Sequence, residues 1–118
     1  MRQGKAYILA AVLAALLLVS TEGVAEPRAF ELAVRDGKLP AEQRVVRVRQ
    51  GDDVTLRWTT DKALTIHLHG YDIEVPLKPA AAVSMRFTAR ASGRFPVEIH
   101  SHGRGEHRVL AHVEVHPR

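Results

Sequence analysis

The seven histidines are the residues of this sequence most able to do chemistry, and all of them lie between His67 and His116. They include two His-x-His pairs, His67-Leu68-His69 and His100-Ser101-His102. On an extended strand, positions i and i+2 project from the same face about 6–7 Å apart, so each pair can direct two imidazoles at one ion. Two pairs on neighbouring strands would supply four nitrogens, a donor set that suits copper or zinc and matches calcium or magnesium poorly.

We therefore predict a metal site whose imidazoles converge from two separated segments at one end of the fold. The candidate ligands are the two histidine pairs together with a nearby carboxylate and a further histidine, namely His67, His69, Glu98, His100, His102 and His107. Solvated imidazoles on the polar face of a strand remain the simpler explanation of a single pair. His112 and His116 alternate with valines near the end of the chain, so we expect them to face water.

Apolar residues alternate with polar ones along most of the chain after residue 26, which is the pattern of half-buried strands. The pattern predicts strands around residues 30–34, 46–48, 54–58, 64–68, 73–75, 83–87, 95–99 and 109–115. We expect an all-β fold, a Greek-key β-sandwich or barrel of seven or eight strands. Pro96 interrupts one predicted strand, which should therefore lie at a sheet edge or carry a bulge.

Residues 1–25 have the composition of a cleavable signal peptide. Arg2 and Lys5 precede an unbroken apolar run from Ala6 to Val19, and Gly23-Val24-Ala25 offers small residues to a signal peptidase. The run is shorter than the ~20 residues that span a bilayer, so we expect cleavage after Ala25. Residues 26–118 would then form a single domain of a periplasmic or secreted protein that does not span the membrane.

The composition excludes several classes of function. The 118-residue chain contains no cysteine, so disulfides and thiolate chemistry are excluded. Its formal net charge of +4 is spread along the chain without aromatic interleaving, and no nucleic-acid partner is expected. Ser84, Ser92 and Ser101 lack the setting of an activated nucleophile, and we expect no enzymatic activity.

Three groups of residues carry a family resemblance: Val46 with Gly51-Asp52-Asp53-Val54-Thr55-Leu56, then Ile66-His67-Leu68-His69-Gly70-Tyr71-Asp72, and then Gly93-Arg94-Phe95. Together they resemble the cupredoxin-like domain of exported copper proteins, over nearly the whole of residues 26–118. In blue-copper members, a strand that begins Gly-x-Tyr/Phe ends in the copper-binding cysteine, which a histidine and a methionine follow.

The resemblance places Ile99 at that cysteine, His102 at the histidine and His107 at the methionine, and it matches the upstream histidine to His67 or His69. Without the thiolate, a blue electron-transfer site is ruled out. Imidazoles with one carboxylate imply instead a tetragonal Cu(II) site, or a Zn(II) site. The paired histidines are also similar to those of multicopper oxidases, but one chain supplies too few for a three-copper cluster.

From the two histidine pairs, the missing cysteine and the signal peptide, we expect an exported periplasmic copper-binding protein that serves copper storage, delivery or homeostasis. Copper, with zinc as the alternative, is the expected metal, and a membrane or periplasmic copper-handling protein is the expected partner. The competing hypothesis is a degenerate cupredoxin that binds no metal and acts as a structural or docking module for a membrane partner.

Overall fold

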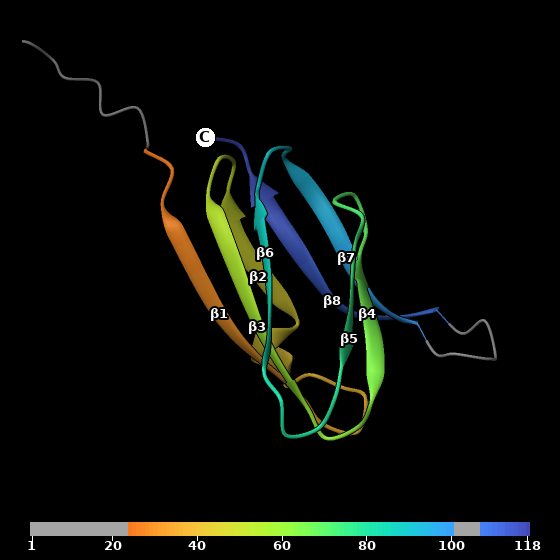
Figure 1. Cartoon of the computed structure of the whole chain (residues 1–118). Coiled ribbons are helices and arrows are strands. Elements are labelled where there is room, and N and C mark those ends of the chain that lie inside the picture. Colours follow the sequence, from red (N-terminus) through yellow and green to blue (C-terminus); the bar gives the residue numbers. More distant parts are fainter. Residues whose placement is uncertain (1–23, 101–106) are drawn as a thin grey trace, which may run out of the picture.

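The chain folds into two stacked β-sheets, as the computed structural model shows for residues 24–100 and 107–118 (Figure 1). One sheet has the strand order β1-β3-β6 and the other the order β2-β8-β7-β4-β5. A short 3-10 turn precedes β2. The strands are β1 (Pro27–Val34), β2 (Val45–Arg49), β3 (Asp53–Thr60), β4 (Leu64–Leu68), β5 (Ile73–Leu77), β6 (Val83–Thr88), β7 (Gly93–His100) and β8 (His107–His116). The prediction of an all-β sandwich of seven or eight strands is therefore confirmed.

The core lies between the two sheets because apolar side chains alternate along the strands. In β3, for example, Val54, Leu56 and Trp58 are at most 1% exposed, whereas Arg57 between them points to solvent. The strands β1 and β2 lie in different sheets, where β1 runs parallel to β3 and β2 runs parallel to β8. Among the described residues, no helix is long and apolar enough to cross a membrane.

Pro96 does not lie at a sheet edge. It is in β7, which runs between β8 and β4, and it pairs with His112 of β8. The prediction of an edge strand is therefore wrong, but the alternative of a nearby bulge is confirmed by a register shift between Val97 and Glu98. The Pro96 carbonyl still takes part in the sheet, since it accepts a hydrogen bond of 3.0 Å from the His69 backbone N–H.

The bulge changes which face the first residues of β8 present. The pairing passes from Val97 with Ala111 to Glu98 with Val109, so Leu110 has no partner of its own. Leu110 takes a buried position, and Val109, which the alternating pattern placed in the core, is 48% exposed. An extra residue reverses the face of everything beyond it. His107, which pairs with His100, consequently lies on the outward face of the sheet.

A buried carboxylate joins the two ends of the described chain. Asp52 follows β2 and is 3% exposed. Its Oδ2 accepts a hydrogen bond of 2.9 Å from the Arg49 N–H, and its Oδ1 accepts bonds of 3.2 Å from the Glu26 N–H and 2.5 Å from the Arg118 guanidinium. Burial raises the pKa of the Asp52 carboxyl, but these hydrogen bonds and the Arg118 charge outweigh it, and the pKa lies below its usual value.

We expect Asp52→Ala to lower the free energy of unfolding by about 2 kcal/mol at neutral pH, because the substitution removes the buried carboxylate that accepts three hydrogen bonds. The native pKa of Asp52 lies below the unfolded value of ~3.9. Its stabilisation is therefore fully present above that value and is lost as the pH falls through the native pKa. Urea unfolding at about pH 7 and about pH 3 should show a difference between wild type and variant that shrinks in acid.

Asp53→Ala is the matched control, since Asp53 is exposed and its carboxylate accepts one side-chain hydrogen bond, from Thr88 at 3.1 Å. Its expected effect on the free energy of unfolding is within about 0.5 kcal/mol. Equal losses in the two variants, or a loss in Asp52→Ala that persists in acid, would contradict this account.

Candidate metal centre

Strand alternation sets the direction of the histidines in β4. Ile66 and Leu68 are fully buried in the core, so His67 between them points outward, and His69 follows on the same side just beyond the strand. In β7, Ile99 faces the core in the same way, and its neighbours in the strand face outward. These two strands pair antiparallel, with His67 directly opposite Glu98. The site therefore lies on the outer face of the five-stranded sheet, near the end where β7 finishes.

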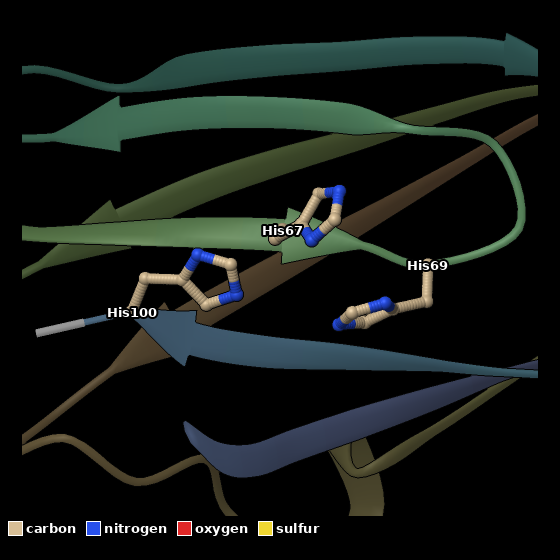
Figure 2. Close-up of side chains that lie close together, drawn as sticks. All are labelled: His67, His69 and His100. Carbon is tan, nitrogen blue, oxygen red and sulfur yellow. The ribbon is translucent and has the colours of Figure 1, made fainter. Parts of the chain in front are cut away.

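Three histidine rings meet on this face (Figure 2). The ring centroid of His67 lies 4.3 Å from that of His69 and 5.0 Å from that of His100, and the last two are 6.2 Å apart. One candidate ligand atom from each ring lies within 4.8 Å of the other two. Nitrogens on opposite sides of a bound zinc would be about 4 Å apart, so small side-chain movements would bring all three onto one ion.

The predicted ligands fall into two overlapping groups. Besides the three histidines, Glu98, His100 and His107 also place one ligand atom each within 4.8 Å of the others. Five of the six predicted residues thus come together, and the sixth, His102, lies outside the described residues. On the same strand as His107, His112 is half-buried and His116 exposed, and neither belongs to these groups.

The three rings carry buried nitrogens without hydrogen-bond partners among the described residues. These atoms are Nδ1 of His67, Nε2 of His69 and Nε2 of His100, each with less than 1 Å² of accessible surface. An unsatisfied buried polar atom costs about 1–3 kcal/mol. A metal ion would satisfy all three atoms at once, so the donor set fits a nitrogen-binding metal such as copper or zinc.

Glu98 brings a carboxylate to the same place. Its Oε2 lies 3.0 Å from Nε2 of His69, 3.4 Å from Nδ1 of His107 and 4.0 Å from Nε2 of His100. The contact with His69 has the distance of an ion pair without the alignment of a hydrogen bond. The Glu98 side chain is 19% exposed. This oxygen is therefore positioned to join the histidines around an ion.

Two further carboxylates lie beside the rings, and neither contact was predicted from the sequence. His67 Nε2 donates a hydrogen bond of 3.2 Å to Asp72 Oδ1, which leaves its Nδ1 for a ligand. His100 Nδ1 lies 3.8 Å from Glu74 Oε1. Histidines that bind metals commonly donate their second N–H to such a group, which fixes the ring and its tautomer. Glu74 lies near the rings because it is directly opposite His67 in the antiparallel β4–β5 pair. That position can be recognised only once the register of the two strands is known.

Comparisons with known proteins identify the fold. No protein-family model matches the sequence, and no curated protein matches it significantly. The structure is similar to a blue copper oxidase from Nitrosomonas europaea (TM-score 0.63, 21% identity, covering 78% of this chain and 39% of that one). It is also similar to a heme-copper terminal oxidase (TM-score 0.61, 19%, covering 75% and 64%) and to a copper-binding protein in its apo form (TM-score 0.60, 8%, covering 78% and 97%).

The fold is cupredoxin-like. At these identities the similarity shows the fold alone, and the chain spans less than two thirds of the two oxidase chains. In this cupredoxin-like domain, Ile99 is 7% exposed and belongs to the core, where the family resemblance would place the copper-binding cysteine. The histidines instead gather on the opposite face of the same strand.

A tight turn in the cupredoxin-like domain holds His69 in place. Gly70 has φ +85°, and a Cβ added there would lie 2.3 Å from Cδ1 of Phe95. The Phe95 ring is held by Tyr71, with ring centroids 5.0 Å apart, and Tyr71 also stacks on Phe87 at 4.8 Å. The turn that carries His69 is therefore packed against an aromatic cluster.

We expect Gly70→Ala to destabilise the domain by about 3 kcal/mol, from the positive φ and from the clash with Phe95. It should also move the His69 ring. Denaturant unfolding and the NMR signals of His69 measure the two effects.

Gly51→Ala is the control, because Gly51 has φ +91° but nothing within 4 Å of the added Cβ. It should cost only the backbone strain, about 1 kcal/mol, and leave the His69 signals in place. Equal destabilisation by the two substitutions would show that the Phe95 contact does not constrain the turn.

Proposed function

We propose that this chain is a copper-binding protein that holds one copper ion on the outer face of its five-stranded sheet. The observation that carries the proposal is the set of buried imidazole nitrogens without partners on His67, His69 and His100, which lie within reach of a single ion. Glu98 supplies the candidate fourth ligand. The copper proteins among the structural neighbours support this choice.

The donor set favours copper over other ions. Imidazole nitrogens and one carboxylate bind divalent copper more tightly than zinc in the Irving–Williams order, and calcium and magnesium prefer oxygen. The sequence has no cysteine, so the site would lack the thiolate on which an intense blue colour depends. A Cu(II) form should give the electron paramagnetic resonance spectrum of a tetragonal site.

The role we infer is to store copper or to deliver it, without catalysing a reaction. The leader-like residues 1–25 support a periplasmic or secreted location, and the partner would be a membrane or periplasmic protein that receives the metal. The outward position of the histidines favours such an exchange, since His69 and His107 retain 39% and 59% of their side-chain exposure.

The test is to measure the affinity of the purified protein for Cu(II) by competition with a chelator, together with the thermal shift. At a free copper concentration 100 times the dissociation constant, binding should add about 2.7 kcal/mol of stability. His67→Ala should weaken binding by at least about 100-fold, and Asp72→Asn, which replaces the charged acceptor of the His67 hydrogen bond with a neutral amide, by about 10-fold.

His116→Ala serves as control, because His116 is exposed and lies outside both ligand groups. It should leave the affinity unchanged. A wild-type protein with no copper affinity tighter than about micromolar, or the same affinity after His67, His69 and His100 are all changed to alanine, would overturn the proposal. That outcome would favour the metal-free docking module.

A further inference from the structure

The two candidate ligand groups share His100 and differ in how open they are to solvent. In the inner group, His67, His69 and His100 direct buried nitrogens at one another. In the outer group, Glu98 and His100 are joined by His107, whose side chain is 59% exposed. Since an imidazole nitrogen binds one ion at a time, His100 Nε2 can serve only one of the two groups at any moment.

Glu98 connects the two groups. The same oxygen, Oε2, lies 3.0 Å from the inner His69 Nε2 and 3.4 Å from the outer His107 Nδ1. An ion bound to Glu98 would therefore need to move only a short way to exchange His69 for His107 as a ligand. The β8 bulge at Leu110 is what creates this arrangement, because without the extra residue His107 would face the core.

From this geometry we propose that the outer group, Glu98, His100 and His107, is the position through which a metal ion is captured and released. The inference rests on the proposed copper-binding function and adds the route by which copper reaches and leaves the inner group. Copper first binds the exposed His107 together with Glu98, and it then exchanges His107 for His67 and His69 of the inner group. In the first step Glu98 and His107 replace water ligands of the ion, and in the second His67 and His69 replace His107 and one further water. Every metal–ligand bond that forms is thus matched by one that breaks, and the oxidation state does not change.

The test separates rates from equilibrium. Cu(II) is transferred from the loaded protein to excess EDTA, and the recovery of fluorescence from Trp58, the one tryptophan, follows its release. His107→Ala should slow both release and uptake roughly 10-fold, while the dissociation constant changes less than about 3-fold, because the constant is the ratio of the two rates. The substitution removes an exposed side chain, so folding should be unaffected.

Matched variants distinguish the outcomes. His116→Ala, on the same strand, should change neither rate, and His67→Ala should weaken the affinity itself. Unchanged rates in His107→Ala would overturn the path and leave the proposed function intact. A large loss of affinity in His107→Ala would make His107 a permanent ligand and would also overturn the path. A wild-type protein that binds no copper would overturn both proposals.

A second inference concerns Asp52 and is independent of the metal. The Glu26 backbone is fixed on both sides, since its N–H donates to Asp52 Oδ1 at 3.2 Å and its carbonyl accepts from the Asp53 N–H at 3.1 Å. Just before it, Val24 is 77% exposed, and β1 begins just after it, at Pro27. The expected cleavage after Ala25 would therefore leave the new amino terminus beside a buried carboxylate.

We infer that this cleavage creates an ion pair between the Glu26 ammonium and Asp52, which stabilises the mature domain. In the hydrolysis, water gives its hydroxyl to the Ala25 carbonyl, and the Glu26 nitrogen becomes a protonated amine. Asp52 Oδ1 already binds Arg118, but a carboxylate has about four acceptor sites. A cleft of about 520 Å³ surrounds the pair, and its lining also includes Arg28, Arg47, Arg49, His116 and Arg118.

The buried apolar core of the described chain lies between Leu32 and Val115, so a chain that begins at Glu26 keeps all of it. We compare the exported protein, its first residue checked by mass, with a form that retains Val24-Ala25. The chain from Glu26 should melt about 4–8 °C higher near neutral pH. The pair requires the charged ammonium, whose ordinary pKa is ~7.7–8.0, so the advantage should be lost at alkaline pH as the amine gives up its proton.

Asp52→Asn in both forms completes the test, since it removes the charge and should abolish the difference between them. The inference is overturned by equal melting temperatures of the two wild-type forms, by a difference that survives Asp52→Asn, or by a mature chain that begins elsewhere. None of these results bears on copper binding.

Discussion

The pairing of β4 with β7 is the constraint on which the candidate site depends. Ile66 and Leu68 in one strand, and Val97 and Ile99 in the other, are at most 7% exposed and lock both strands with one face in the core. A slip of one residue would turn every side chain to the opposite face, which would scatter the imidazoles. The hydrophobic core thus positions the site without contacting a ligand.

Holding the rings in this way has an energetic cost. Domains of this size are stable by only about 5–15 kcal/mol, and each unsatisfied buried polar atom removes about 1–3 kcal/mol. Three such nitrogens lie in the site, and the indole N–H of Trp58 is a fourth such atom among the described residues. The domain has no disulfide to offset this cost, since the sequence lacks cysteine. The site is therefore the place where a bound ion would add most to stability.

The features that the sequence predicted are those that depend on one strand alone. The spacing of His67 and His69 on either side of a buried leucine is readable from the alternating pattern, and so is the face they share. The bulge at Leu110 could not be predicted, because it depends on how β8 packs against β7, and it moved Val109 out of the expected core. The support of His100 by Glu74 was hidden for the same reason, since it requires the register between strands.

The two faces of β7 separate a core residue from the candidate metal ligands on the same strand. At the position that the family resemblance matches to the cysteine, Ile99 is 7% exposed and packs in the core. Glu98 and His100 flank it and point outward, where β4 adds His67 from the side. An outward site of imidazoles is more open to ligand exchange than a site enclosed between sheets, and it lacks the sulfur that tunes fast electron transfer. This placement supports the proposed role in holding copper over a role in electron transfer.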